Sequence, residues 1–476
     1  EVQTNSYNEF LESKIISDQI NELSKGIDKV FKSIFPIEDG NDKSTLEYIS
    51  YKLEKPKFDV IECKQRSLSY SAALKANLRL VVYDIDPENN TKQIMSAKEQ
   101  EVFIGDLPLM TPSATFITNG VERVVVNQMH RSPGVFFDHD KGKTHASGKL
   151  LFNCRIIPGR GSWLDFEFDP KDILYFRIDR KKKLPITTIL FSLGYSKDKI
   201  IETFYTTSKF TYNEETKSWV TDFNIENYKR PQKLSYDLID AKNNKKVLGA
   251  GEKLNIVIAK KLKEKGLNSI SLPSEQIIGK YIANDIKEKD GEILIGAGFD
   301  ITEEQLEKII AQEEKVLNIV NIDMINKGPY ILETLKIEKN SNKADALSDI
   351  YKVLRPGEAP SVEIAEEIFN NLYFKKERYD LSEVGRVKLN SKLNLNTSSK
   401  KTILETEDII AIIKFMLGLR DGKGDVDDID HLGNRRVRSV GELVENQFRI
   451  GLLRMERTVK EKMSTFLEIE SAMPQD

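Results

Sequence analysis

The segment Asp427–Arg438 constrains the fold more than any other part of the chain. It contains three aspartates, a histidine, an asparagine and three arginines, with few apolar side chains between them. Ions left unpaired in an apolar interior are costly. We therefore expect this segment to form a polar surface that offers both hydrogen-bond donors and acceptors, outside any core.

The length of the chain predicts several domains. At 476 residues it is too long for one hydrophobic core, and two to four domains are expected. The net charge of −3 argues against a surface that wraps nucleic acid as a whole, so any such contact must come from local clusters. Cys63 and Cys154 lie far apart without a partner motif, which predicts a reducing, cytoplasmic location. The longest apolar run, Ile409–Leu419, is too short to span a bilayer.

Alternating apolar residues predict strands in the first part of the chain. Leu74, Ala76, Leu78 and Leu80 fall on one face of a strand. The sequence Phe116–Val126 predicts a hairpin, because Asn119 and Gly120 at its centre accommodate the positive φ angles of a type I′ turn. A second hairpin is expected at residues 164–178, with a turn at 169–171. Its outward face would carry Trp163, Asp165 and Glu167 on one strand and Arg177 and Asp179 on the other.

A weak internal repeat lies in the middle of the chain. Val247–Leu254 is echoed by Leu294–Ile301, and each copy leads into a short amphipathic helix and then a strand. Two copies are too few for a solenoid. We interpret them as two strand–turn–helix–strand units. Helices are expected to dominate from Lys343 to Leu419, and a long helix to run from Val440 to Met463 with apolar residues at spacings of four and three.

Several patterns that suggest chemistry fail on inspection. Gly142–Thr144 lacks the earlier glycine of a phosphate-binding loop. The carboxylates at 165, 167 and 169 alternate along a strand, which favours a polar outer face over a metal site. The aspartates at 425–430 place Leu432 where a calcium loop needs an oxygen ligand. Arg180–Lys183 is either a solvated face or a salt-sensitive contact to duplex DNA.

The segment Asp427–Arg438 and its continuation to Glu442 resemble a signature of the β subunit of bacterial DNA-directed RNA polymerase. Further segments resemble the same family in the same order: Phe35–Ile37, Phe58–Val60, Tyr70–Ala72, Asn119–Val126, His130–Phe137, Asp140–His145, Gly161–Pro170, Leu354–Gly357 and Arg378–Leu381. The resemblance covers nearly the whole chain.

The resemblance implies a multidomain α+β fold of mixed antiparallel sheets with helices. Residues 1–130 would form the first part of a protrusion domain, 131–428 a lobe, and 429–476 the second part of the protrusion with the long helix. Residues 204–323 would be a small, lineage-specific α/β insertion in the lobe. Two covalent crossings between the same domains should run close together, which brings Arg131 near Asp430 and Arg435.

The resemblance also implies a pocket for an unpaired guanine of the non-template DNA strand. Its matching residues are Arg131, Trp163, Asp179, Ile429, Asp430 and Arg435. A carboxylate accepts the guanine N1–H and N2–H, an arginine donates to O6 or a phosphate, and an indole stacks a base. The alternative is an interdomain salt bridge that locks protrusion to lobe.

Further residues match family positions less specifically. Arg454 and Arg457 match arginines that face nucleic acid or the main channel, and a solvated helix face is the alternative. Arg123, Val126 and Gln128 match the rim of the rifamycin pocket, although for Val126 a plain sheet residue is the better interpretation.

The resemblance implies a non-catalytic wall of the DNA cleft in a nucleotidyltransferase complex. The family's chains begin upstream and continue past residue 476 into the catalytic half, so the chain alone is expected to be inactive. No cofactor is expected here, because the family's Mg²⁺ belongs to the largest subunit. Expected partners are downstream duplex and non-template DNA, the α, β′ and ω subunits and sigma factor, with no membrane. The alternatives are a factor-docking module and a free-standing DNA-binding regulator, the latter weakened by the acidic net charge.

Overall fold

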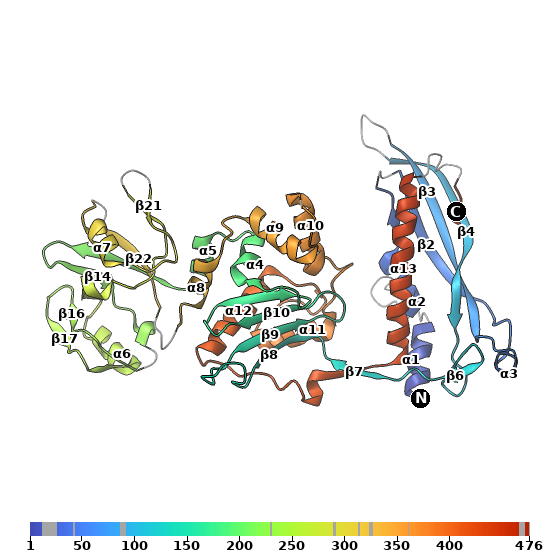
Figure 1. The fold of residues 1–476 in the computed structure, drawn as a ribbon, viewed down its shortest axis with the longest axis horizontal. Helices are drawn as coiled ribbons and strands as arrows, with labels where there is room; N and C mark the ends of the chain where they lie inside the picture. Colours follow the sequence, from blue (N-terminus) through green and yellow to red (C-terminus); the bar gives the residue numbers. More distant parts are fainter. Residues whose placement is uncertain are drawn as a thin grey trace. The chain divides into compact units, whose positions relative to one another are not determined.

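The computed structural model describes residues 1–11, 26–40, 43–85, 92–228, 231–288, 292–312, 315–322, 327–359, 361–465 and 472–475. The chain divides into two compact units. The first unit contains Glu1–Arg131 and Leu432–Asp476, and the second contains Ser132–His431. Each unit packs helices against antiparallel sheets (Figure 1), so the predicted α+β class is confirmed.

The first unit is built on a four-stranded antiparallel sheet. Its strands follow chain order: β1 (Ile37–Glu38), β2 (Ser44–Leu53), β3 (Ser71–Ile85) and β4 (Lys92–Pro108). The predicted alternation is confirmed on β3, where Leu74, Ala76, Leu78 and Leu80 are all buried. On the opposite face Lys75 pairs with Glu54 at 2.7 Å, so this face is polar and cross-linked by charge.

Among the described residues, three helices cover the buried face of this sheet: α1 (Val2–Leu11), α2 (Gly26–Ile34) and α13 (Val440–Thr465) (Figure 1). The apolar stripe predicted on the last helix is confirmed. All seven of its residues belong to the core or pack against it: Val440, Val444, Phe448, Leu452, Met455, Val459 and Met463. Phe448 meets the rings of Phe31 and Phe10 edge-on, with centroids 5.6 and 6.4 Å away.

Smaller elements complete the first unit. A short helix α3 (Val60–Gln65) is capped by Asp59, whose carboxylate accepts from the Glu62 amide at 2.7 Å. The predicted hairpin forms from β5 (Phe116–Thr118) and β6 (Val121–Arg123), with φ angles of 52° at Asn119 and 78° at Gly120. Its second strand ends at Arg123, three residues earlier than predicted.

The second unit is centred on a five-stranded antiparallel sheet in the order β12-β11-β10-β9-β8. The strands are β8 (Gly134–His139), β9 (Phe152–Ile157), β10 (Leu164–Phe168), β11 (Leu174–Ile178) and β12 (Leu184–Pro185). Strands β10 and β11 form the predicted second hairpin. Their six inward residues are buried: Leu164, Phe166, Phe168, Leu174, Phe176 and Ile178.

In the described part of the second unit, seven helices pack around this sheet and share its core: α4 (Ile186–Ser192), α5 (Lys197–Phe204), α8 (Tyr330–Ile337), α9 (Lys343–Leu354), α10 (Val362–Tyr373), α11 (Ser382–Leu393) and α12 (Thr406–Arg420). Within the core, the guanidinium of Arg386 donates to both carboxylate oxygens of Asp408 at 2.8 Å, and both side chains are fully buried. Arg386 also donates to the carbonyls of Lys401 and Ile403. This ion pair therefore has the additional hydrogen bonds that a buried charge needs.

Residues 207–320 contain the predicted repeat and a six-stranded sheet in the order β17-β16-β19-β14-β13-β22. Its strands are β13 (Thr207–Asn213), β14 (Ser218–Asp222), β16 (Leu238–Asp240), β17 (Lys246–Leu248), β19 (Ser269–Pro273) and β22 (Val316–Val320). Two helices and two strand pairs flank it: α6 (Ile256–Glu264), α7 (Glu303–Ile310), β15 (Gln232–Lys233) with β18 (Lys253–Leu254), and β20 (Ile286–Lys287) with β21 (Ile293–Ile295). Each copy thus has the predicted strand, turn, helix and strand. Asp323, the predicted end of this region, lies outside the described residues.

Candidate nucleic-acid interface

A two-stranded ribbon joins the two parts of the chain that make up the first unit. Strand β7 (Gln128–Arg131) pairs antiparallel with β23 (Arg435–Arg438), and Arg131 lies directly opposite Arg435. The predicted approach of Arg131 to Arg435 is therefore confirmed, although the two residues are remote in sequence. Like charges directly opposite each other repel, so this end of the ribbon favours an anion.

The two faces of this ribbon differ in charge. Side chains alternate along each strand, so Arg131, Arg435, Met129 and Val437 share one face. Met129 and Val437 are 51% and 52% exposed, so this face remains open within the first unit. On the other face Glu442 of α13 pairs with Arg436 and lies 4.0 Å from Arg438. Glu442 thus neutralises positive charge on the side of the ribbon that carries Arg436 and Arg438.

In the second unit Asp427 anchors the polar segment to the central sheet. Its carboxylate accepts from the amide of Phe137 at 2.8 Å, and its own amide donates to the Phe137 carbonyl at 2.8 Å. Lys392 pairs with the same carboxylate at 2.7 Å. This role was not predicted, because Phe137 is remote in sequence and no local pattern distinguishes Asp427 from Asp428 and Asp430.

The carboxylate of Asp428 closes a turn, and the carboxylate of Asp430 is exposed. Asp428 accepts from the amide of Asp430 at 3.0 Å, which closes an Asx turn. The turn leaves the Asp430 side chain exposed and Ile429 half-buried before it. The short 3₁₀ turn Leu432–Asn434 then leads into β23. Asp430 is therefore presented by a local hydrogen bond, while Asp427 fixes the base of the segment.

Trp163 and Asp179 meet at the end of the β10–β11 hairpin. The amide of Trp163 donates to the Asp179 carboxylate at 2.8 Å, and the amide of Asp179 donates to the Trp163 carbonyl at 3.1 Å. Asp179 and Arg180 both have positive φ angles, 47° and 59°, which turn the chain back across the indole. The Arg180 guanidinium then lies 5.3 Å from the indole centre. Trp163 is half-buried in this stack and precedes β10, whereas an outward position on the strand was predicted.

The structure places the six predicted pocket residues in three local pairs, one in the first unit and two in the second. Arg131 and Arg435 are partners in the ribbon of the first unit. Trp163 and Asp179 are hydrogen-bonded in the second unit, where Ile429 and Asp430 follow the anchored Asp427. That these groups form one pocket stays a prediction.

The predicted rim residues Arg123, Val126 and Gln128 are all exposed in the first unit. Val126 is 75% exposed and lies between β6 and β7, outside both strands. The interpretation of Val126 as a plain sheet residue is therefore wrong, because β6 ends at Arg123, before the run of valines at 124–126. Its exposure leaves an apolar side chain at the surface beside the ribbon.

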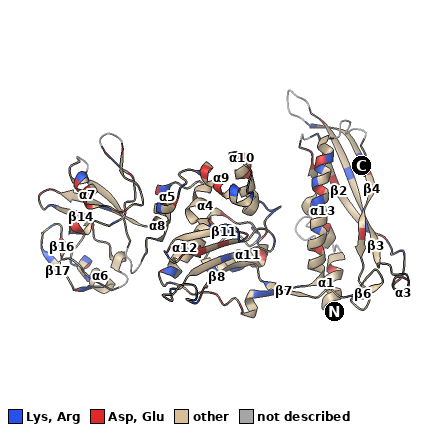
Figure 2. Cartoon of the chain, viewed as in Figure 1, with Lys and Arg blue, Asp and Glu red and all other residues tan. Residues whose placement is uncertain are grey.

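Arg454 and Arg457 both project from the exposed face of α13, where basic and acidic residues alternate (Figure 2). Arg457 pairs with Glu461 at 3.2 Å, and the predicted pair between Lys460 and Glu456 forms at 2.8 Å. Exposed pairs of this kind contribute little to stability. These contacts are compatible with both alternatives for the two arginines.

The carboxylates at 165, 167 and 169 each lie near a cation, and the cation beside Asp169 is Lys183, 3.8 Å away. Glu167 pairs with Arg177 at 2.9 Å, and Asp165 lies 3.9 Å from Arg155. Burial raises the pKa of Asp165, so this residue is less solvated than the predicted polar face implies. Among the described residues, no group of three or more His, Cys, Asp and Glu side chains is arranged to hold a metal ion.

The rejected phosphate loop is closed by a carboxylate. Asp140 accepts from the amides of Gly142, Thr144 and Leu151 at 3.0, 3.1 and 2.9 Å. The hydrogen bond from Leu151 contributes most to lowering the pKa of Asp140. These amides are already satisfied, which gives the loop a structural role.

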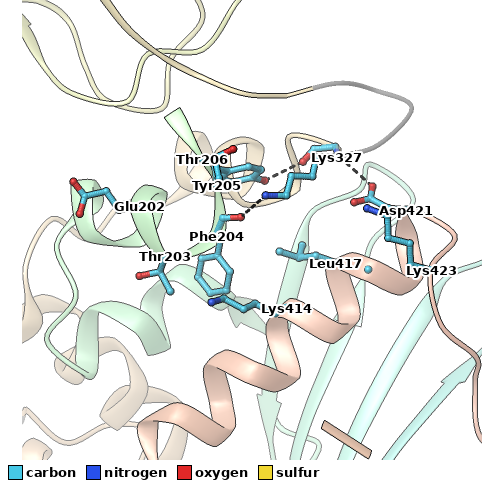
Figure 3. Close-up of a pocket in the computed structure, with 12 residues that line it drawn as sticks. Glu202, Thr203, Phe204, Tyr205, Thr206, Lys327, Lys414, Leu417, Asp421 and Lys423 are labelled. Atoms are coloured by element: carbon cyan, nitrogen blue, oxygen red, sulfur yellow. Dashed lines mark hydrogen bonds between the residues drawn. The ribbon is translucent and has the colours of Figure 1, made fainter. Parts of the chain in front are cut away.

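A cavity of about 410 Å³ opens at the base of the repeat region (Figure 3). It lies between the end of α5, the chain that returns from the repeats at Lys327 and Gly328, and the end of α12. Asp421 accepts from the Gly328 amide at 3.2 Å and from the Tyr330 hydroxyl at 2.9 Å. These bonds fix the returning chain to α12. The lining of the cavity includes none of the predicted site residues.

Comparison with known proteins identifies the family. Residues 131–246 and 312–438, about half of the chain, match the family described as RNA polymerase Rpb2, domain 2. The chain also aligns over its full length with proteins named DNA-directed RNA polymerase subunit beta. The chain belongs to the β-subunit family of bacterial DNA-directed RNA polymerase.

The similar β subunits come from several bacteria. The protein from Caulobacter sp. (strain K31) is 50% identical over 479 residues, and the one from Jannaschia sp. (strain CCS1) is 51% identical over 489. The protein from Rhizobium leguminosarum bv. trifolii (strain WSM2304) is 51% identical over 477 residues. Each alignment covers 100% of this chain and 34–35% of the relative. The chain thus spans about a third of the length of these β subunits.

Most of the repeat region lies in the gap between the two ranges of the family match. The matched ranges stop at residue 246 and resume at 312, so they omit both helices of the repeat region, α6 and α7. The matched part includes the central sheet of the second unit, the ribbon strand β23 and the last residue of β7, Arg131. Among the described residues, no helix has the length and apolar composition needed to cross a membrane.

Proposed function

We propose that this β-subunit chain forms a non-catalytic wall of the polymerase DNA cleft and recognises an unpaired guanine of the non-template strand. The observation that carries the proposal is the pairing of Arg131 with Arg435 across the ribbon. It gathers two guanidinium groups at the point where the chain leaves and re-enters the first unit. The exposed carboxylate of Asp430 lies five residues before Arg435.

The proposed chemistry uses both signs of charge. The Watson–Crick edge of guanine presents N1–H and N2–H donors and the O6 acceptor. Asp430 accepts the two donors, because its carboxylate is exposed and its backbone is held by Asp428. Arg131 and Arg435 donate to O6 or to a neighbouring phosphate. Adenine lacks O6 and the N1–H donor, so the same groups discriminate against it.

Trp163 provides the proposed stacking surface. Arg180 already covers part of the indole, so a base either extends this stack or displaces the guanidinium. Asp179 acts as a positioning residue, since its carboxylate holds the backbone amide of Trp163. Ile429 supplies apolar contact beside the carboxylate. Stacking of one base contributes roughly 1–3 kcal/mol, in a sequence-tolerant manner.

The remaining assignments of the family are proposals of the same kind. Arg454 and Arg457 face nucleic acid or the main channel, and Arg123, Val126 and Gln128 border the rifamycin pocket. Nucleotidyl transfer takes place on the largest subunit, where Mg²⁺ is bound, and this chain alone is inactive. The α, β′ and ω subunits, sigma factor, downstream duplex and non-template DNA are its partners in the cytoplasm.

The test uses Asp430→Asn in the whole enzyme. Open-complex lifetime is measured on four promoters that differ in one unpaired non-template base. The amide replaces an acceptor oxygen with a donor, so the guanine preference is expected to fall by about 1–3 kcal/mol, or roughly 5- to 150-fold. Asp425→Asn is the matched control, because Asp425 is also exposed and lies two residues before the segment Asp427–Arg438.

The two interpretations of the charged residues give different results. If they form only a salt bridge, Asp430→Asn changes the lifetime equally for all four bases. An unchanged preference for guanine, with Asp425→Asn behaving in the same way, would remove Asp430 from base recognition.

A further inference from the structure

The two copies of the repeat share a detailed hydrogen-bond pattern. In the first copy (residues 232–273) Asp237 accepts from the Ala250 amide at 2.7 Å, and in the second (residues 280–320) Asp285 accepts from the Ala297 amide at 2.6 Å. Three further backbone hydrogen bonds of the first copy run from Gly251 N to Leu234 O, from Leu234 N to Glu252 O and from Glu252 N to Gly249 O. Their counterparts in the second copy run from Gly298 N to Ile282 O, from Ile282 N to Phe299 O and from Phe299 N to Gly296 O. Asn255 and Thr302 also correspond, because their side chains cap the helices α6 and α7. Positions in the two copies can therefore be equated residue by residue.

In the second copy one edge is covered by helix α8. Ala283, Ala297 and Val320 are buried there as part of the main core of the second unit. A Cβ atom on Gly298 would lie 3.6 Å from Leu332 and 3.7 Å from Leu335, which sit one turn apart on α8. The edge of the second copy is thus a surface that receives two leucine side chains of a helix.

Two polar contacts fix the orientation of α8 on this edge. The Tyr281 hydroxyl donates to Glu333 at 2.5 Å, and Lys336 pairs with Asp300 at 2.8 Å. Tyr281 and Asp300 are bridge partners across the edge, so both side chains rise from the same side of it. The helix therefore contacts the edge through two leucines flanked by charged residues.

In the first copy the equivalent edge is open. Ser235, Ala250, Gly251 and Pro273 take the places of Ala283, Ala297, Gly298 and Val320, and all four are exposed. A Cβ atom on Gly251 would meet no atom of the described chain within 4 Å. We call these four residues, with Lys233 and Lys253, the docking edge.

The charge on the docking edge is reversed relative to the second copy. Lys233 and Lys253 are cross-strand partners in β15 and β18, in the positions that Tyr281 and Asp300 occupy. Both lysines are exposed. A helix with a lysine in the place of Lys336 would be repelled by Lys253, so a second copy of α8 does not fit. A carboxylate in that place would be attracted.

We propose that the docking edge of the first copy binds an acidic amphipathic helix of a partner protein. The helix presents two leucine-sized side chains three residues apart, as Leu332 and Leu335 do on α8. It carries carboxylates in the places of Glu333 and Lys336, opposite Lys233 and Lys253. The interaction is independent of the ribbon and of guanine recognition.

The test uses a labelled peptide of residues 327–340 with Lys336→Glu, held helical by a side-chain staple because short helices are marginal in water. Its affinity for the full chain is measured by fluorescence anisotropy. We expect saturable binding, and we expect Lys233→Glu with Lys253→Glu to weaken it by about tenfold, because two attractive contacts become repulsive. The peptide with Lys336 retained should bind more weakly.

A matched control keeps the net charge change constant. Lys260→Glu with Lys263→Glu alters two exposed lysines of α6, outside the docking edge, and should leave binding unchanged. Carbodiimide coupling should join the peptide carboxylate to Lys253 or Lys233, identified by mass spectrometry. Absence of saturable binding, or equal weakening by both lysine pairs, would overturn the proposal.

Discussion

Lys280 is a cation placed where burial opposes its charge. Its side chain is half-buried, and the ammonium lies 5.1 Å from the centre of the Phe210 ring. Burial lowers the pKa of Lys280 to about 8, against an ordinary value of 10.5. In the folded chain this lysine loses its proton at a lower pH than in the unfolded chain. Its effect on stability is therefore linked to pH.

Lys280→Met is expected to remove that linkage. Between about pH 8 and 10.5 the unfolded chain binds one more proton than the folded chain at Lys280, so its contribution to stability rises with pH. The variant should exceed the unaltered chain in stability most at and below pH 8, with the difference shrinking toward pH 10.5. Urea unfolding at several pH values measures the difference. If the difference in stability between the two proteins does not change with pH, the pKa of Lys280 in the folded chain equals its ordinary value.

Single residues also show why some site features could not be predicted from sequence. Asp427, Asp428 and Asp430 are neighbours of the same type, yet one anchors a strand, one closes a turn and one faces solvent. The distinction depends on Phe137, which is remote in sequence. Trp163 likewise follows the strand alternation in sequence, but the turn at Asp179 and Arg180 brings a guanidinium over its ring. Such contacts are set by tertiary structure.

At the scale of elements, periodic patterns predicted the fold well. The stripe of α13, the turn at Asn119 and Gly120 and both copies of the repeat are local features, and all were confirmed. Predictions failed where an element ended without a local signal. The valines at 124–126 extend the predicted strand to Val126, but pairing with β5 stops at Arg123, which is opposite the first residue of β5. The length of the partner strand β5 sets the end of β6, and the strand propensity of the following valines does not.

Substitution by alanine is expected to have opposite effects on stability at two glycines of helix α13. Gly441 packs against α1, and a Cβ atom there would overlap the backbone carbonyl of Ser6. Gly451 is exposed, and a Cβ atom there would meet no described atom within 4 Å. Gly441→Ala should therefore destabilise the first unit by about 1–3 kcal/mol. Gly451→Ala should stabilise it by about 0.5–1 kcal/mol through helix propensity.

Thermal or urea unfolding of the two variants provides the comparison, and each serves as the control for the other. Both changes add one methyl group to the same helix, so propensity alone would raise stability in both. If Gly441→Ala were as stabilising as Gly451→Ala, the close approach of α1 and α13 at Ser6 would be absent in solution.

At the scale of the whole molecule, the repeat region is joined to the second unit through two neighbouring chains. Asn321 donates its amide to the Thr206 carbonyl at 2.9 Å, and Thr207 is the register partner of Val320. The outgoing and returning chains are therefore adjacent. Residues 207–320 also have two hydrophobic clusters of their own, separate from the main core. Residues 207–320 can thus be deleted by joining these two adjacent chains, and the central sheet of the second unit stays intact.

Deletion of residues 207–320, with Thr206 joined to Asn321 through two glycines, should leave RNA synthesis by the whole enzyme within about threefold of normal, under 1 kcal/mol of activation free energy. None of the proposed pocket residues lies in the deleted range. The deletion should lower thermal stability, because Leu332 and Leu335 lose the cover of Gly298. Transcription is assayed after co-purification of the subunits, which separates failed assembly from failed synthesis. Loss of RNA synthesis in a fully assembled enzyme would mean that the repeats take part in the basal reaction. If the shortened enzyme is active and keeps its preference for guanine, base recognition lies outside the repeats.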